Sequence, residues 1–232
     1  QCAQLWVAKA PVEMLLVGRN LQKIEIVAAD LRARSPDSEI TVSQVDFVDP
    51  LAITALVEEM AQAKQIDIAL VAHGSLPNQL ECQESINKTK DKLLINGISP
   101  VLFAEAFVER MQKADAGTLA IIGSVAGDRG RKSNYVYGAA KGLVTRYVQG
   151  LQHRLANTKV KVVLIKPGPT DTPMTAHLKQ KGTKLASVDR VAREIVRGIE
   201  EGRRVVYTPK IWWVIMMIIR HLPYFVFRKL DI

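Results

Sequence analysis

The sequence predicts an α/β fold in which parallel strands form a doubly wound sheet within a single domain. Two observations lead to this expectation. Short runs of β-branched and apolar residues alternate along the chain with longer segments of helical periodicity, as they do in βα units. In addition, no internal repeat and no linker divides the 232 residues, a length that is sufficient for one substantial core.

The expected elements follow one another in a regular order. Residues Gln1–Lys9 are typical of the last part of a helix and lead into the first strand. Strands are expected where apolar and β-branched residues cluster, at Val12–Val17, Ile40–Val45, Ile66–Val71, Thr118–Gly123, Val160–Ile165 and Val205–Tyr207. Helices are expected at Leu51–Lys64, Thr89–Gln112, Tyr135–Ala156 and Val188–Glu200.

A serine, a tyrosine and a lysine carry the strongest chemical signal. Ser124 directly follows the strand Thr118–Gly123, and open α/β sheets bind ligands at the carboxyl ends of their strands. Tyr137 and Lys141 are four residues apart, so a helix places both on one face. We expect the charge of Lys141 to lower the pKa of Tyr137 and so make the phenol a better acid. The three side chains predict a proton donor for a carbonyl group.

The stretches Gly123-Ser124-Val125-Ala126-Gly127 and Tyr137-Gly138-Ala139-Ala140-Lys141 resemble motifs of the short-chain dehydrogenase/reductase family. The small residues Gly138, Ala139 and Ala140 are expected to let another molecule lie close to the helix. The resemblance implies a Rossmann-like sheet and the reduction of a ketone by hydride transfer from a nicotinamide. It also implies a catalytic set, in which Asn96 completes a proton relay to water beside Ser124, Tyr137 and Lys141.

The same resemblance implies a set of cofactor-binding residues. Asp46 matches the family's adenine-contacting aspartate, and Thr172 lies where the nicotinamide carboxamide is bound. His73, in Ala72-His73-Gly74, departs from the family's Asn-Asn-Ala-Gly, and we expect a hydrogen-bonded histidine without a role in the chemistry. The complete set is Arg19, Asp46, Gly74, Tyr137, Lys141, Pro167, Gly168 and Thr172.

Arg19 carries the expectation about cofactor preference. It follows the strand Val12–Val17, where a carboxylate would bind the ribose hydroxyls of NAD. A cation there favours the additional phosphate of NADP(H). If Arg19 instead stacks on the adenine, NAD(H) serves equally well.

The amino terminus departs from the family pattern. The family's Gly-rich turn and first strand would precede Gln1. The turn that binds the cofactor's pyrophosphate therefore cannot be assigned to any residue of this sequence. We therefore interpret the sequence as amino-terminally incomplete, with the first strand absent.

The net charge of +9 at pH 7 raises nucleic acids and anionic membranes as partners. The sequence contains no aromatic-rich RNA motif or DNA-binding module, so we expect no nucleic acid partner.

After a dehydrogenase domain of residues 1–209, the tail 210–232 begins with the apolar run Ile211–Ile219. This run is shorter than the roughly 20 residues of a membrane span, but its tryptophans and flanking cations suit the headgroup region. The alternative is a tail that packs on its own core or on a second subunit.

A second basic segment, Asp128–Lys132, joins Ser124 to Tyr137. Its arginines either bind a substrate phosphate or form a solvated loop. This segment and the Trp-rich tail are most similar to the decaprenylphosphoryl-2-keto-ribose reductase group, which implies a keto-sugar on a polyprenyl phosphate. An ordinary reductase of another lipophilic ketone is the alternative. We expect a homo-oligomer in the cytoplasm, peripheral at the inner face of the membrane.

Cys2 and Cys82 are the two cysteines, and they lack metal-ligand spacing. This pattern indicates a reducing compartment without a disulfide scaffold or metal site.

A non-catalytic nucleotide-binding regulator on the same fold is the alternative function, suggested by the absent Gly-rich turn and by Ala72-His73-Gly74. The presence of Asn96, Ser124, Tyr137 and Lys141 together favours an enzyme.

Overall fold

The computed structural model describes residues 1–176, 180 and 184–230, and the described residues form two parallel sheets. One sheet pairs β1 (Glu13–Gly18) with β2 (Glu39–Gln44). The other has the order β3-β4-β5-β6, formed by Ile68–Val71, Thr118–Ile122, Lys161–Pro167 and Val205–Thr208. All six predicted strands are present, with ends displaced by at most two residues.

The single sheet expected from the sequence is therefore divided. Among the described residues, β1 pairs with β2 and β3 pairs with β4, but β1 and β3 do not pair with each other. Leu15 and Val17 of β1 nevertheless pack against the main core, so the small sheet remains part of the same folded unit. The expectation that the family's first strand precedes Gln1 stays a prediction.

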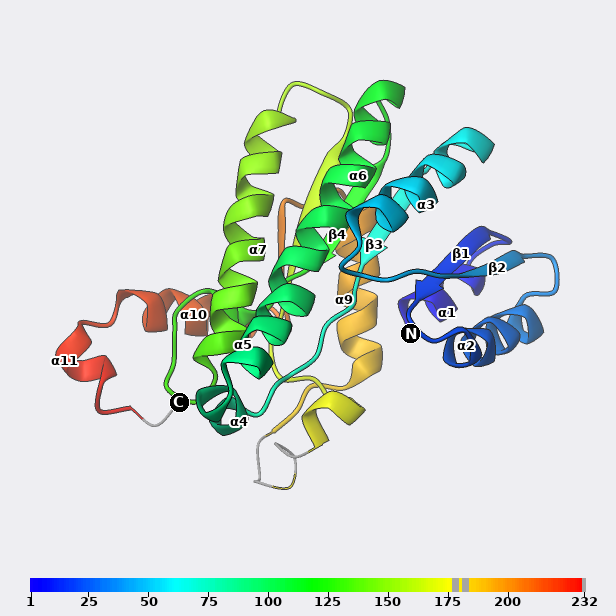
Figure 1. Cartoon of the computed structure of the whole chain (residues 1–232). Coiled ribbons are helices and arrows are strands. Elements are labelled where there is room, and N and C mark those ends of the chain that lie inside the picture. The colour runs from blue at the N-terminus through cyan, green and yellow to red at the C-terminus, as the bar shows by residue number, and fades with distance from the viewer. Residues whose placement is uncertain (177–179, 181–183, 231–232) are drawn as a thin grey trace.

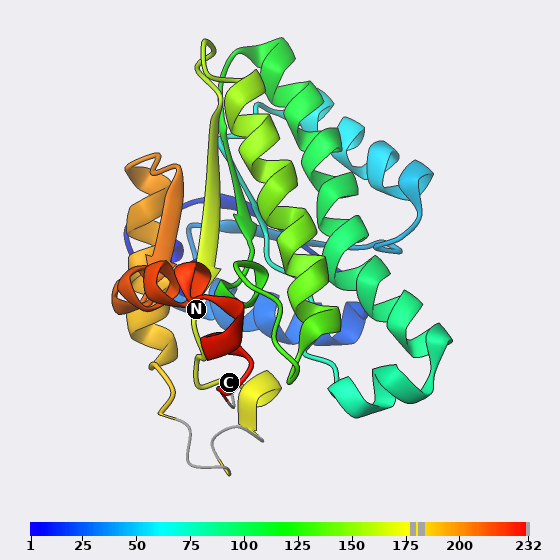
Figure 2. The ribbon, with the colours of Figure 1, turned by 90° about the vertical axis from the view of Figure 1, so that its left-hand side faces the viewer.

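Helices cover both faces of the four-stranded sheet (Figures 1 and 2). On one face lie α3 (Pro50–Ala63), α6 (Ser99–Ala114) and α7 (Tyr135–Arg154), and on the other lies α9 (Val188–Glu200). The other α-helices that the structure describes are α1 (Cys2–Val7), α2 (Leu21–Arg34), α4 (Gln79–Glu84), α5 (Ile86–Leu93), α10 (Ile211–His221) and α11 (Tyr224–Phe227).

The strands build two separate cores because successive side chains point to opposite faces of a sheet. Leu119 and Ile121 of β4 belong to the core beneath α6 and α7. The intervening Ala120 belongs instead to the core beneath α9. This alternation is the physical basis for the apolar character of the whole strand, because both of its faces are buried.

A π-helical turn, Leu94–Ile98, interrupts the long helix that the sequence predicts at Thr89–Gln112. Pro100 lies in the first turn of α6. Because proline has no backbone N–H, it cannot donate to the carbonyl of Asn96, the acceptor four residues earlier in a regular helix. Asn96 therefore lies within a widened helical turn. Single π-turns of this kind are frequent at functional sites.

Helix α2 is not among the helices that the sequence predicts. Ile26 and Val27 are 72% and 49% exposed, so the apolar residues of this segment do not form a single stripe. The helix begins at a conventional cap, in which the Asn20 side chain accepts a hydrogen bond from the Lys23 N–H at 2.9 Å.

The carboxyl-terminal helices α10 and α11 lie at the opposite end of the molecule from β1 and β2 (Figure 1). Met216 of α10 is buried, so part of the tail is covered by the rest of the chain. Other side chains of α10 are exposed, among them Trp213 and Ile218 at 55% and 60%. Across the described residues, none of the helices has the length and hydropathy needed to cross a membrane.

Candidate active site

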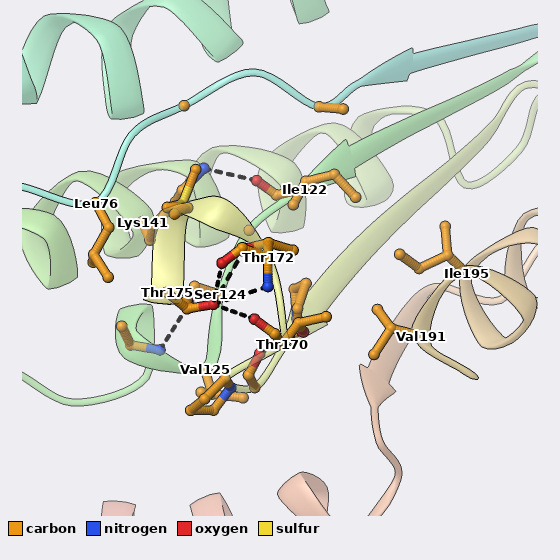
Figure 3. Close-up of a pocket in the computed structure, with 18 of the residues that line it drawn as sticks. Leu76, Ile122, Ser124, Val125, Lys141, Thr170, Thr172, Thr175, Val191 and Ile195 are labelled. Atoms are coloured by element: carbon orange, nitrogen blue, oxygen red, sulfur yellow. Dashed lines mark hydrogen bonds between the residues drawn. The ribbon is translucent and has the colours of Figure 1, made fainter. Parts of the chain in front are cut away.

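A cavity of about 340 Å³ opens at the carboxyl ends of β3, β4 and β5, where ligands bind in open α/β sheets (Figure 3). Segments distant in the sequence meet at this cavity. Its walls include seven of the predicted site residues, namely Gly74, Ser124, Tyr137, Lys141, Pro167, Gly168 and Thr172.

Ser124 lies immediately beyond β4, in an extended backbone conformation that ends the strand. Its Oγ accepts a hydrogen bond from the Ala126 N–H at 3.1 Å and so caps the 3₁₀ turn Val125–Gly127. The residue is buried, and its side chain is held by this turn at the cavity wall.

Tyr137 and Lys141 project from one face of α7, as the spacing predicts, and the Lys141 Nζ atom is 5.9 Å from the centre of the Tyr137 ring. The expected lowering of the Tyr137 pKa is wrong for this structure. Burial raises the pKa of Tyr137, and the neighbouring Ser124 hydroxyl opposes that rise only in part. The loss of phenolate solvation on burial therefore outweighs the hydrogen bond from Ser124 and sets the direction of the pKa shift.

Lys141 is itself buried, with 2% of its surface exposed. Its Nζ donates a hydrogen bond to the carbonyl oxygen of Ile122 at 2.9 Å (Figure 3). Burial lowers the pKa of Lys141 to about 8, because an ammonium is costly to desolvate. A lysine with this pKa gains or loses its proton near physiological pH.

Asn96 lies behind the cavity wall and is completely buried. Its Nδ2 donates to the carbonyl oxygen of Lys92 at 2.9 Å, and its Oδ1 accepts from the Ser75 N–H at 2.8 Å. A Cβ added at Gly74 would lie 2.9 Å from the Asn96 Oδ1 and 3.7 Å from the Lys141 Nζ. Gly74 thus allows the segment after β3 to approach both catalytic candidates.

The glycines around α7 provide close packing within the protein. A Cβ at Gly127 would lie 2.6 Å from the Lys141 carbonyl, and one at Gly138 would lie 3.0 Å from the Ala126 oxygen. These contacts hold the turn after Ser124 against α7. The expectation that Gly138 leaves room for another molecule is therefore wrong, because the protein's own backbone fills that space.

The segment after β5 forms another wall. Thr172 begins the turn Pro173–Thr175, and its backbone N–H donates to the Thr175 Oγ1 at 3.1 Å. The indole of Trp212, from α10, lies against Gly168, where an added Cβ would be 1.9 Å from the Trp212 Nε1. The tail therefore contributes to the cavity directly, a role that the sequence analysis missed.

Two predicted cofactor residues lie outside the residues that line the cavity. Arg19 is exposed, with its guanidinium carbon 5.8 Å from the centre of the Phe47 ring. The Asp46 Oδ1 accepts a hydrogen bond from the Val48 N–H at 3.0 Å, within its own loop. Their proposed roles at a cofactor stay predictions.

His73 is hydrogen-bonded, as expected, with its Nε2 2.7 Å from the Ser99 Oγ. The pKa of His73 is lowered to about 4, mainly by burial and further by the positive charge of Lys141. The imidazole is consequently neutral at pH 7.

A buried ion pair joins the segment after Ser124 to the sheet. Lys166 of β5 pairs with Asp128, and the side chains are 5% and 2% exposed. The Tyr207 hydroxyl of β6 donates to the second carboxylate oxygen at 2.8 Å. Burying such an ion pair costs free energy unless its remaining polar atoms are also hydrogen-bonded. Here the Tyr207 hydroxyl provides that hydrogen bond to Asp128. In the sequence, Asp128 stands out only as the single acidic residue of a basic segment, and nothing there indicates its partner.

Arg129, the next residue, binds the tail. Its Nη1 donates to the carbonyl oxygens of Ile219 and Leu222, the latter at 2.7 Å. Its guanidinium carbon is 3.7 Å from the centre of the Phe227 ring. These contacts give the carbonyls at the end of α10 a charged donor and join the basic segment to the tail.

The parallel sheets, the helices on both faces and the polar cavity at the strand ends define a Rossmann-like α/β protein. A model of the short chain dehydrogenase family matches residues 2–183. This chain belongs to that family and is an oxidoreductase.

Relatives in sequence agree with this assignment. An uncharacterized oxidoreductase of Mycobacterium tuberculosis is 29% identical over 223 residues, which cover 96% of this chain and 89% of the relative. An uncharacterized oxidoreductase of Staphylococcus aureus is 27% identical over 194 residues, covering 83% and 82% of the two chains.

Solved structures show the same fold. A short-chain dehydrogenase from Sphingobium yanoikuyae in complex with NADPH has a TM-score of 0.81 at 20% identity, covering 96% of this chain and 91% of the other. Levodione reductase has a TM-score of 0.79 at 19% identity, with 89% of each chain covered.

Proposed function

We propose that the chain reduces a ketone to an alcohol by hydride transfer from NADPH, with Tyr137 as the general acid. The observation that carries this proposal is the meeting of Ser124, Tyr137 and Lys141 at one cavity, with Asn96 directly behind its wall. A nucleotide-binding regulator does not need a proton donor at this place.

The proposed roles follow from the chemistry of each side chain. Tyr137 has a raised pKa and so remains protonated at neutral pH, ready to donate to a developing alkoxide. Ser124 offers a hydroxyl that hydrogen-bonds the carbonyl oxygen. Lys141 supplies a positive charge that stabilises the phenolate left behind, and Asn96 supports the relay by which a proton returns from water.

The residues present fit a nicotinamide nucleotide, which supplies the hydride when bound. The wall formed by Pro167, Gly168 and Thr172 combines an apolar surface with hydroxyl groups, as a nicotinamide with its carboxamide requires. The Ser75 hydroxyl is buried and has no hydrogen-bond partner within the described part of the chain. It adjoins the backbone N–H that donates to Asn96, and it can accept a hydrogen bond from a ligand. We propose that Arg19 and Asp46 contact the adenosine end, with Arg19 favouring NADP(H) over NAD(H).

We also propose a lipophilic substrate, of which a keto-sugar on a polyprenyl phosphate is one candidate, and a peripheral location at the cytoplasmic face of the membrane. Support comes from the tail of residues 210–232, since α10 and α11 expose Trp213, Ile218 and Phe225. Lys210, Arg220, Arg228 and Lys229 lie beside them, a composition suited to an anionic membrane surface. The catalytic domain would comprise residues 1–209, and assembly as a homo-oligomer is part of the proposal.

The proposal is tested by incubating the full-length protein with NADPH or NADH and ketones of increasing hydrophobicity. Loss of absorbance by the reduced cofactor, with stoichiometric formation of the alcohol, is the expected result. Binding of cofactor without turnover of any ketone would instead support the regulator.

A further inference from the structure

The cavity contains a cation that the proposed mechanism does not use. Arg131 lines it, and across residues 1–176, 180 and 184–230 no hydrogen bond or ion pair of its side chain is found. The Nε atom is buried and has no hydrogen-bond partner among these residues. Arginine is rarely buried without a partner, because its desolvation must be compensated.

The two arginines of the basic segment have different surroundings. Arg129 donates through its Nη1 to the carbonyl oxygens of Ile219 and Leu222, and its guanidinium lies over the Phe227 ring. Asp128, the nearest carboxylate in sequence, is occupied by Lys166 and Tyr207. Consequently Asp128 and the carbonyl oxygens of the tail are used by other groups, and Arg131 lines the cavity.

The position of Arg131 is fixed by the backbone rather than by its side chain. Its carbonyl oxygen accepts a hydrogen bond from the Asn134 N–H at 3.1 Å, which closes a turn directly before α7. Asn134 lines the same cavity, and its buried Oδ1 accepts no hydrogen bond from the residues that the structure describes. Two orphaned polar groups therefore lie at the ends of one turn, close in sequence to Tyr137.

The charged side chains that line the described part of the cavity are positive. Its described lining residues include Arg131 and Lys141 but no aspartate or glutamate. Burial lowers the pKa of Arg131 from its usual value, yet guanidinium remains charged at neutral pH. An anionic ligand would satisfy this charge with a charge-assisted, bidentate hydrogen bond.

We infer that Arg131 binds an anionic group of the substrate, so that the ketones reduced carry a carboxylate or a phosphate, with Asn134 accepting a hydrogen bond from a substrate donor. This inference rests on the proposed reductase function and specifies its substrate class. The shared chemistry of the ligand is an oxyanion that guanidinium can bind through two N–H groups.

The test uses pairs of ketones that differ only in charge, namely 5-oxohexanoate against 5-oxohexanamide and 9-oxodecanoate against 9-oxodecanamide. Reduction is measured at saturating NADPH for the wild type, Arg131→Leu and Arg131→Lys. Arg146→Leu is the matched control, since Arg146 is an exposed arginine of α7. Direct binding of each carboxylate is also measured by titration calorimetry on protein saturated with NADP⁺.

We expect kcat/KM for at least one carboxylate to fall by about 10- to 100-fold in Arg131→Leu, mainly through KM, while the amides change little. Arg131→Lys should recover part of the loss, and Arg146→Leu should behave like the wild type. A similar loss for acids and amides would show a structural role, and a raised KM for NADPH would place Arg131 at the cofactor. Either result overturns the inference.

Failure of the inference is distinguishable from failure of the proposed function. If the wild type reduces the ketones but does not prefer carboxylates of either length, the reductase stands and the role of Arg131 falls. If it reduces neither acids nor amides, the calorimetry decides: carboxylate binding lost in Arg131→Leu supports the anion site, and equal binding by both proteins overturns it.

Discussion

The Lys141 Nζ atom donates a hydrogen bond to the carbonyl oxygen of Ile122 at 2.9 Å, so the lysine of α7 is held by the end of β4. This contact places the ammonium between the strand that precedes Ser124 and the helix that carries Tyr137. It also explains how a lysine is tolerated when only 2% of it is exposed.

Burial of Lys141 should make the stability of the protein depend on pH. Its pKa is about 8 in the folded state, whereas the unfolded side chain keeps its ordinary value near 10.5. Between these values the unfolded chain binds the additional proton, so this residue's contribution becomes more favourable as pH rises. Relative to Lys141→Met, the wild type should gain about 2 kcal/mol in unfolding free energy between pH 7 and pH 9.5.

Chemical denaturation of both proteins at the two pH values measures this difference. The comparison with Lys141→Met cancels the titration of groups that the two proteins share. An unfolding free-energy difference that is independent of pH would mean that Lys141 is not desolvated.

Breaking the buried pair between Lys166 and Asp128 should be strongly destabilising. Lys166→Met leaves the carboxylate buried with only the Tyr207 hydroxyl, at a cost of about 3 to 5 kcal/mol in unfolding free energy. The double variant Lys166→Met/Asp128→Leu removes both charges and should recover much of the loss. Thermal and denaturant unfolding test this, and a double variant no more stable than the single one would contradict it.

Arg19 should affect one cofactor selectively. If it pairs with the 2′-phosphate, Arg19→Ala weakens NADPH binding by about 1.5 to 3 kcal/mol and leaves NADH binding nearly unchanged. Its exposed side chain over Phe47 is free to make this contact without disturbing the core. Calorimetric titration measures both affinities, and equal losses would show that Arg19 only stacks on the adenine.

The exposed side of α10 should bind anionic vesicles. Truncation after Pro209 is a poor test, because it would also remove Trp212 from the cavity and the buried Met216. Trp213→Glu/Ile218→Glu changes only exposed side chains and should abolish co-sedimentation with anionic vesicles at low salt. Each nearby basic residue contributes about 1 kcal/mol, which salt screens.

Ile86→Glu is the matched control for this substitution, since Ile86 is 88% exposed on α5. It should sediment with vesicles as the wild type does. Equal binding by Trp213→Glu/Ile218→Glu and the wild type would remove the physical support for a membrane-borne substrate.

The strands were predictable because local physics determines them. Segments such as Leu119–Ile121 are apolar on both faces, which is the pattern of a strand buried between two layers of helices. Tyr137 and Lys141 were predictable for a related reason, since their four-residue spacing on one helix fixes their relative positions before any tertiary contact forms. The place of Ser124 at a strand end was also predictable, but its approach to Tyr137 depends on the packing of the turn after β4 against α7.

The remaining features depend on contacts between distant residues. Asp128 and Lys166 are separated by 38 residues, and Arg129 and Ile219 by 90, so neither partner identifies the other in the sequence. The direction of the Tyr137 pKa was mispredicted for the same reason, since burial is a tertiary property. The π-turn at Asn96 did have a local signal in Pro100, which removes the donor that a regular helix requires.

The central claim is that Tyr137 is the proton donor, and the most direct test is the rate of hydride transfer in Tyr137→Phe. Tyr135→Phe is the matched control, because Tyr135 lies on the same helix and is 45% exposed. The rate is measured in single-turnover experiments with NADPH and a ketone that the wild type reduces. We predict a loss of at least about 100-fold in Tyr137→Phe, with NADPH affinity retained and Tyr135→Phe unaffected. A Tyr137→Phe protein that transfers hydride at nearly the wild-type rate would contradict the account.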